Sequence, residues 1–233
     1  MEDRFSRTTS LLGSEAMRAL AGARVAVFGV GGVGGACAEA LARTGVGAID
    51  LFDNDKVSVT NLNRQVVALE STLGLFKADV MAERIRDINP QCEVRAFKIF
   101  YMPDTSGEVD LSAYDYVVDA IDTVAGKIEL VEQAKKAGAR VICSMGAANK
   151  TCPSAFVVTD VKKTETDPLA RAVRKELRAR GIEGVKAVWS KEEPKANCRP
   201  PASCAVVPAA CGLLLASEVI KDLIKKSAEN SAI

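Results

Sequence analysis

The sequence predicts an α/β fold: a doubly wound, mostly parallel sheet with helices on both faces. Short apolar stretches such as 24–28 and 48–52 alternate with longer stretches of helical periodicity. A glycine-rich turn at 29–34 directly follows the first apolar stretch, Asp53 follows the second, and Asp122 follows a later one. Open sheets of this class bind ligands beyond the carboxyl ends of their strands. We therefore expect these residues to meet at one crevice.

The first two thirds of the chain carry clear signals for individual elements. Ser14 is suited to the position that caps a helix at its start, and Gly45 and Gly138 are placed to end helices. Pro90 ends another helix. We expect helices at 14–20, 33–44, 76–89 and 127–137, and strands at 24–28, 48–52, 92–100, 116–120 and 140–143.

The pattern changes after Pro153. A strand is expected at 155–159, and Asp167 followed by Pro168 predicts the start of a helix that runs to about Arg180. The stretch 183–201 contains several Pro and Lys residues and is expected to be rich in loops. A brief strand at 206–207 and a helix at 209–225 complete the prediction.

Composition excludes several classes of protein. Net charge is +1, which gives no global attraction to nucleic acid or membranes, and no apolar run is long enough to span a membrane. Seven cysteines without a CxxC pair argue against a disulfide framework and a zinc site of that type, and the polar N-terminus favours the cytoplasm. The absence of histidine removes imidazole catalysis. Reactions driven by charge stabilisation, such as nucleotidyl transfer, are favoured.

The glycine-rich turn indicates a nucleotide. Gly29, Gly31 and Gly34 match GxGxxG, and Asp53 lies at the distance expected for an acid that binds ribose. At this point NAD and ATP fit equally well. A cluster of Asn, Arg and Gln between 53 and 65, followed by Lys77, favours ATP, since cations there can stabilise charge on the phosphates. An NAD-dependent oxidoreductase stays open, but it would lack a histidine proton donor.

These motifs resemble the superfamily of ubiquitin-activating enzymes and their bacterial relatives, over about residues 4–160. The resemblance implies a Rossmann-like fold that adenylates a carboxylate with ATP and Mg²⁺, with Asp122 serving the metal. Arg7 resembles an arginine that reaches the ATP of the partner subunit, which implies a homodimer. The implied catalytic residues are Arg7, Arg64, Lys77 and Asp122. The implied nucleotide-binding residues are Gly29, Gly31, Gly32, Asp53, Asp55, Asn61, Asn63, Arg64, Gln65, Lys77 and Asp122.

The second half of the chain indicates which carboxylate is activated. The segment VTDVKKTETDPLARAVRKELRARG at 158–181 resembles the tRNA threonylcarbamoyladenosine dehydratases. That resemblance implies that the threonyl carboxylate of a modified adenosine in the tRNA anticodon loop is adenylated and then closes into a ring. The alternative is an adenylyltransferase that activates the C-terminus of a ubiquitin-like sulfur carrier protein. Many such enzymes carry two CxxC zinc pairs, and this chain has none.

Charge agrees with an RNA substrate. Between 162 and 199 there are eleven Lys and Arg against six Asp and Glu, although a solvated helix face would look the same.

We expect residues 1–160 to form the adenylation region, and residues 161–233 a small basic extension of helices and loops packed on it, within one domain. Ring closure needs no cysteine, so Cys198, Cys204 and Cys211 are secondary candidates. A sulfur-transfer or redox partner and a monovalent cation site are left open.

Overall fold

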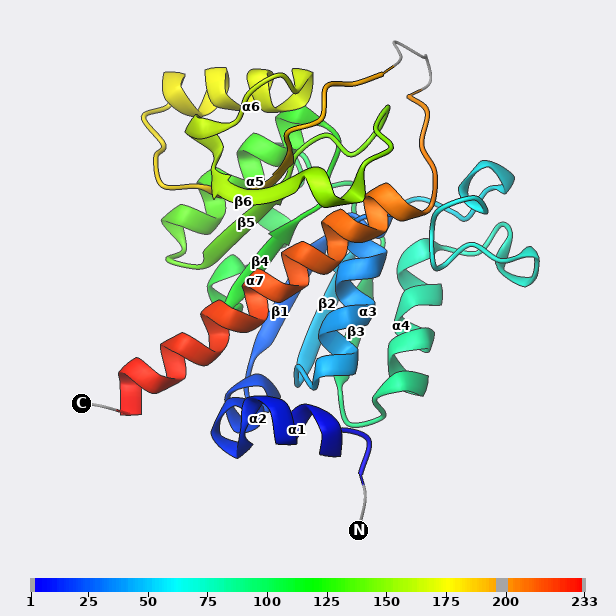
Figure 1. Cartoon of the computed structure of the whole chain (residues 1–233), viewed down its shortest axis with the longest axis vertical. Helices are drawn as coiled ribbons and strands as arrows, with labels where there is room; N and C mark the ends of the chain where they lie inside the picture. The colour runs from blue at the N-terminus through cyan, green and yellow to red at the C-terminus, as the bar shows by residue number, and fades with distance from the viewer. Residues whose placement is uncertain (1–2, 196–200, 232–233) are drawn as a thin grey trace.

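A seven-stranded sheet forms the centre of the molecule in the computed structural model, which describes residues 3–195 and 201–231 (Figure 1). The strand order is β3-β2-β1-β4-β5-β7-β6. Neighbouring strands are parallel except β6, which runs antiparallel to β7. The predicted doubly wound α/β fold is confirmed. The strands are β1 Arg24–Phe28, β2 Ala48–Phe52, β3 Glu93–Phe97, β4 Tyr116–Asp119, β5 Arg140–Ser144, β6 Phe156–Asp160 and β7 Lys186–Ser190.

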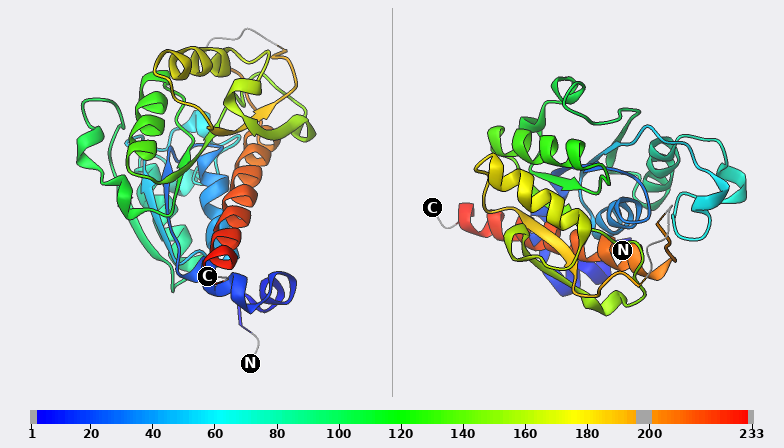
Figure 2. Two further views of the ribbon diagram at one scale, coloured as in Figure 1. Left: turned by 90° about the vertical axis from the view of Figure 1, so that its left-hand side faces the viewer. Right: turned by 90° about the horizontal axis from the view of Figure 1, so that it is seen from above.

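Helices cover both faces of the sheet, as Figure 2 shows in two further views. One apolar cluster joins the sheet to α2, α3, α4 and α7, and a second joins it to α5 and α6. Each of these six helices therefore buries an apolar side against one face, whereas α1 has no buried residue. The helices are α1 Ser6–Leu12, α2 Ser14–Ala21, α3 Gly34–Thr44, α4 Lys77–Ile88, α5 Val124–Lys136, α6 Pro168–Ala179 and α7 Val206–Ser231. Short 3₁₀ turns are Val59–Asn61, Glu70–Thr72, Ser106–Glu108, Leu111–Ala113, Pro153–Ala155 and Val161–Lys163.

Two expectations for the second half were wrong. The stretch 183–201, expected to be loops, contributes strand β7 between β5 and β6. Lys186 interrupts the apolar pattern there, but its amine reaches Asp222 at 2.6 Å on α7, so the strand still fits inside the sheet. The brief strand at 206–207 is instead the first turn of α7. Pro208, which lacks an amide hydrogen, is tolerated in a first turn. Helix α1 was not predicted.

The strand order reverses between β1 and β4, which lie side by side in the sheet. The chain leaves β1 toward one face and β4 toward the other, so a crevice opens at the carboxyl ends of these two strands. Helices α1 and α2 lie at the opposite end, at the bottom of Figure 1. Among the described residues, no helix has the length and apolar character required to cross a membrane.

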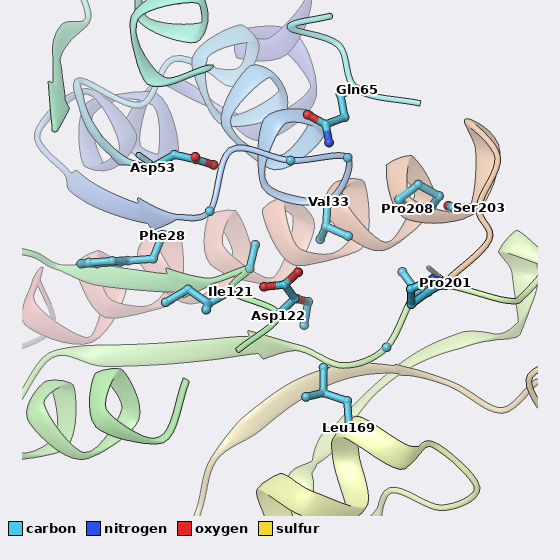
Figure 3. A pocket seen from close by; sticks show the side chains of 18 of the residues that line it. Phe28, Val33, Asp53, Gln65, Ile121, Asp122, Leu169, Pro201, Ser203 and Pro208 are labelled. Atoms are coloured by element: carbon cyan, nitrogen blue, oxygen red, sulfur yellow. The ribbon is translucent and has the colours of Figure 1, made fainter. Parts of the chain in front are cut away.

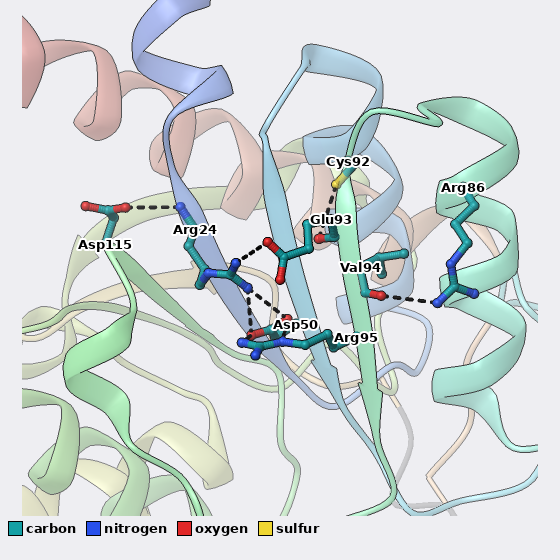
Figure 4. Close-up of polar contacts among 8 residues, drawn as sticks. All are labelled: Arg24, Asp50, Arg86, Cys92, Glu93, Val94, Arg95 and Asp115. Carbon is teal, nitrogen blue, oxygen red and sulfur yellow. Dashed lines mark hydrogen bonds and ion pairs between the residues drawn. The ribbon is translucent and has the colours of Figure 1, made fainter.

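A charged cluster joins the three strands β1, β2 and β3 (Figure 4). Asp50 on β2 is fully buried and accepts a hydrogen bond at 2.9 Å from Nε of Arg95. Arg24 lies 3.4 Å from the same carboxylate and also pairs with Glu93 at 2.5 Å. A buried carboxylate is tolerated in a sheet when paired in this way. This cluster lies away from the crevice and stabilises the sheet.

Candidate active site

A cavity of about 600 Å³ lies at the carboxyl ends of the central strands (Figure 3). The glycine-rich turn forms one wall, and a second wall comes from the chain after β5 and the start of α6. Its lining combines aromatic and aliphatic side chains with acidic and basic ones. The lining includes Phe28, Gly29, Gly31, Gly32, Phe52, Asp53, Asp55, Arg64, Gln65, Lys77, Ile99, Tyr101, Ile121, Asp122, Ser144, Gly146, Asn149, Asp167 and Leu169.

The glycines of the turn have different tasks. Gly29 has φ +85°, and a Cβ there would lie 2.6 Å from the carbonyl oxygen of Ala120. Gly29 is therefore required by the backbone itself. Gly31 is different, because the nearest atom to a Cβ built there is Nε2 of Gln65 at 3.8 Å. The space beside Gly31 belongs to the cavity, so a ligand can approach its backbone closely.

Asp53 lies directly after β2 with its carboxylate held by two amides. Val30 N donates to Oδ2 at 2.6 Å, and Asp55 N donates to Oδ1 at 2.8 Å. Burial raises the pKa of Asp53 above its usual value. These two hydrogen bonds and the charge of Lys77 oppose the shift without cancelling it. The carboxylate is thereby fixed between the glycine turn and the cavity, as Figure 3 shows. This placement suits hydrogen bonding to the hydroxyl groups of a ribose.

Lys77, the first residue of α4, places a buried cation against the cavity. Its side chain is 7% exposed, and its amine lies 2.7 Å from Oδ2 of Asp55. Asp55 itself is mostly exposed, so it can move away when a more negative group enters. A lysine held in this way is suited to phosphate, which would replace the carboxylate as its partner.

The chain after the 3₁₀ turn Val59–Asn61 brings Arg64 and Gln65 to the cavity. Arg64 Nη1 donates to the carbonyl oxygen of Thr60 at 2.8 Å and to Oδ1 of Asn63 at 2.9 Å. Asn63 in turn donates to the carbonyl oxygen of Ser203 at 2.9 Å. Gln65 is 8% exposed, and among the described residues its Oε1 has no hydrogen-bond partner. Its Nε2 is the atom nearest to a Cβ built at Gly31, so it faces the space beside that glycine. A donor at this place suits the oxygen atoms of a nucleotide.

Not every residue predicted for the site reaches the cavity. Asn61 is buried and accepts a hydrogen bond from Ser58 N at 3.1 Å, so its side chain shapes the turn that carries Arg64. Asn63 does not line the cavity, but its Oδ1 accepts a hydrogen bond from Arg64, which does. Arg7 is exposed on α1 at the other end of the molecule. Within one chain, Arg7 therefore does not meet the cavity.

Asp122 is exposed after β4 and lines the cavity. No group of three or more Cys, Asp or Glu side chains with metal-site geometry occurs among the described residues. A single carboxylate does not hold Mg²⁺ alone, but Mg²⁺ commonly takes one or two carboxylates together with phosphate oxygens and water. The donor set therefore fits a metal ion that arrives with a nucleotide.

The second wall of the cavity was not predicted from the sequence. Two segments of this wall line the cavity: residues 144–149, which begin at the last residue of β5, and residues 167–169, which cap and start α6. The rule that ligands bind beyond the carboxyl ends of strands applies to β5 as well as to β1 and β4. Applied there, it would have marked the stretch SMGAAN. The contribution of α6 depends on long-range packing and has no local signal.

The cysteines differ in accessibility. Cys211 is fully buried on α7, and burial raises its pKa to about 12. It therefore stays a neutral thiol and is a poor nucleophile. Cys204 is exposed just before α7. Cys198 lies outside the described residues.

A basic stripe runs along the outer side of α6. Arg171, Lys175 and Arg178 are exposed, follow the i, i+4, i+7 spacing of one helix face, and make no ion pair with a described residue. Arg174 differs, because its Nη1 donates to Oγ1 of Thr164 at 2.6 Å. Arg180 pairs with Glu132 at 2.5 Å. Three cations thus remain available to an anionic partner.

Comparison with known proteins identifies the family. A family model described as the ThiF family matches residues 5–232. The chain belongs to the ThiF family. Within this family, it is 46% identical to the tRNA threonylcarbamoyladenosine dehydratase of Bacillus subtilis, over 97% of this chain and 96% of that relative.

Solved structures agree with this placement of the ThiF-family chain. The crystal structure of the Escherichia coli tRNA N6-threonylcarbamoyladenosine dehydratase in complex with ATP matches with a TM-score of 0.92 and 40% identity, over 97% of this chain and 96% of that one. An adenylyltransferase and sulfurtransferase of Culex quinquefasciatus is 40% identical, but over only 52% of this chain and 28% of its own length. The chain thus belongs with the dehydratases of the family.

Proposed function

We propose that this chain is an ATP-dependent tRNA threonylcarbamoyladenosine dehydratase. The observation that carries the proposal is the extent of the similarity: it runs over 97% of the chain and so includes both the glycine-rich turn and the basic helix α6. An enzyme that shared only nucleotide binding would match only the first half. The cavity supports the proposal, because it holds a phosphate-binding turn, a ribose-binding acid and two cations.

The reaction has two steps. A carboxylate oxygen of the threonyl group attacks the α-phosphorus of ATP, and the bond to pyrophosphate breaks, which leaves an acyl adenylate. An internal nucleophile of the same modification then attacks the carboxyl carbon, and AMP and a proton leave as the ring closes. The second step is intramolecular, so it benefits from a very high effective concentration. No cysteine is needed as an intermediate carrier.

The residues of this chain stabilise charge in the first step. The backbone at Gly31 and Gly32 lies against the phosphates, and Asp53 holds the ribose. Negative charge grows on the phosphoryl oxygens and on departing pyrophosphate, and Arg64 and Lys77 are the cations that neutralise it. In the free enzyme the amine of Lys77 rests on Asp55 at 2.7 Å. ATP would displace that carboxylate, so the cation is already in place when the nucleotide binds.

Mg²⁺ and a second subunit complete the proposed site. Asp122 would hold Mg²⁺, which neutralises phosphate charge when bound. Arg7, which does not reach the cavity of its own chain, is assigned to the ATP site of the partner in a homodimer. The cytoplasm, where tRNA is modified, is the proposed compartment. A sulfur-transfer or redox partner is not required by this reaction.

The proposed tRNA surface is the basic stripe Arg171, Lys175 and Arg178. Single changes to Gln should weaken tRNA binding and should each lower the salt dependence by about one counterion. Arg18→Gln on α2, an exposed arginine at the other end of the molecule, is the matched control. Filter binding over a range of salt concentrations measures both quantities. An unchanged salt slope in all three variants would remove α6 from the RNA surface.

Turnover separates this function from the sulfur-carrier alternative. The purified protein is incubated with ATP and Mg²⁺, and either with tRNA that carries threonylcarbamoyladenosine or with a small protein that ends in two glycines. We expect AMP release with the modified tRNA only. Release that depends on the diglycine protein would replace the proposed function with the adenylyltransferase one.

A further inference from the structure

Lys150 and Asp167 form a buried ion pair beside the cavity. The amine of Lys150 lies 2.8 Å from Oδ2 of Asp167, and the two side chains are 0% and 2% exposed. Lys150 comes from the segment after β5, and Asp167 immediately precedes α6. The pair thus connects two segments that are far apart in the sequence and that together form the second wall.

Each member of the pair makes a further contact that fixes its own segment. Lys150 also donates to the carbonyl oxygen of Gly146 at 2.5 Å. Asp167 Oδ1 accepts a hydrogen bond from Ala170 N at 2.9 Å and so caps α6. A Cβ at Gly146 would lie 2.5 Å from Oδ2 of Asp167, so the two segments approach as closely as a glycine permits.

A positive φ angle is found next to both partners. Among the described residues, the two non-glycine residues with positive φ are Asn149, at 60°, and Thr166, at 52°. Each directly precedes one member of the pair. A β-branched residue such as Thr166 is costly in this conformation, and such strain persists only where the surroundings hold it. Asn adopts this conformation more readily, and Asn149 is also held by hydrogen bonds with Ala202 and Lys195. The ion pair therefore adjoins one strained residue, Thr166, whose conformation the surroundings must hold.

The helix that Asp167 caps carries the basic stripe Arg171, Lys175 and Arg178. A buried ion pair contributes little net stability compared with an apolar replacement, but it can fix one arrangement. We propose that Lys150 and Asp167 are positioning residues, which hold α6 at a fixed place beside the cavity so that RNA on the basic stripe presents its modified base to ATP. This inference rests on the proposed function, and it adds the residues that connect RNA binding to the reaction.

The test must separate positioning from stability. Lys150→Met or Asp167→Asn alone leaves a buried group without its partner and lowers the melting temperature. The double variant K150M/D167N removes both charges, and Asn still caps α6. We expect it to recover most of the melting temperature and to bind ATP within about twofold of wild type. Its kcat/KM for modified tRNA should stay about 100-fold low, since a displacement near 1 Å can cost that much.

Hydrogen exchange gives a second readout that does not depend on turnover. We expect faster exchange at 144–150 and at the start of α6 in the double variant. Glu132→Gln is the control, because it removes the Arg180–Glu132 ion pair at the other end of α6 and should change neither exchange there nor turnover.

Two results would overturn the inference. One is a double variant that regains wild-type turnover together with its stability. The other is unchanged exchange in both segments. A wild-type protein that releases no AMP with modified tRNA would instead refute the proposed function, and the exchange measurement would still decide whether the pair holds α6.

Discussion

Replacing Gly29 and Gly31 of the turn by alanine should have opposite consequences for stability and for ATP binding. In Gly31→Ala the added methyl meets no atom closer than 3.8 Å, so the free energy of unfolding should change by less than about 0.5 kcal/mol. The methyl occupies the space through which phosphate approaches the backbone. Loss of one hydrogen bond to a charged group costs about 1.5–3 kcal/mol. At about 1.4 kcal/mol per factor of ten, the Kd for ATP should rise about 10- to 100-fold.

Gly29→Ala is the matched comparison. Its Cβ would lie 2.6 Å from the carbonyl oxygen of Ala120, in a backbone with φ +85°. Strain of this kind costs about 1–3 kcal/mol before the steric clash is added, so this variant should lose stability. Calorimetric titration with ATP and Mg²⁺ measures binding, and urea denaturation measures stability. The reasoning is refuted if Gly31→Ala binds ATP like wild type, or if it loses as much stability as Gly29→Ala.

Three further predictions concern stability, pH and cysteine reactivity. Asp50→Asn removes a buried carboxylate from its arginine partners; we expect a loss of about 1–3 kcal/mol in urea denaturation, with ATP binding unchanged. Amide hydrogen bonds from Cys152 and, to a smaller extent, Thr151 lower the pKa of Glu192 from 4.5 to about 2. Its contribution to stability is therefore present above about pH 4.5 and lost toward pH 2, and Glu192→Gln should remove that part of the acid dependence. Iodoacetamide at pH 8 should label Cys204 and spare Cys211, as peptide mass spectrometry can show.

Each of these has its own contrary result. Asp50→Asn with wild-type stability would mean that the charged cluster of Figure 4 is dispensable. Identical acid unfolding of wild type and Glu192→Gln would show that this carboxylate titrates normally. Rapid labelling of Cys211 in the native protein would show that α7 opens from the sheet, and Cys211 would return as a candidate nucleophile. Cys204→Ser should keep full turnover in the same preparation.

Local sequence was sufficient to predict elements that consist of a short apolar run with clear stop signals on both sides. Strands 24–28 and 48–52 were predicted at their observed bounds, because each is a short apolar run between clear stop signals. Strand β7 was missed because Lys186 interrupts its apolar run, and only the packing of α7 supplies the partner Asp222. The β-branched pair Val206-Val207 favoured a strand by propensity. Burial of Val207 against the sheet, through α7, decided the outcome.

The residues of the candidate site also divide into those with a local sequence signal and those that depend on long-range packing. The glycine turn, Asp53 and Lys77 belong to one contiguous set of motifs, and the structure brings all of them to one cavity. Their individual roles stay predictions. The part of the second wall that follows β5 could have been predicted from the rule for strand ends. The part at the start of α6 could not, because it depends on Asp167 meeting Lys150 across 17 positions of sequence. Asn61 resembles a ligand-binding residue in the sequence, yet its side chain is used by the turn.

Isotope transfer tests the central claim, adenylation of the substrate carboxylate, most directly. Modified tRNA with ¹⁸O in the threonyl carboxylate is incubated with the protein, ATP and Mg²⁺, and the products are analysed by mass spectrometry. Attack of the carboxylate on the α-phosphorus, followed by ring closure at the carboxyl carbon, predicts AMP that contains one ¹⁸O atom. Label in inorganic phosphate together with ADP would mean that the γ-phosphorus is attacked, and the account would be wrong.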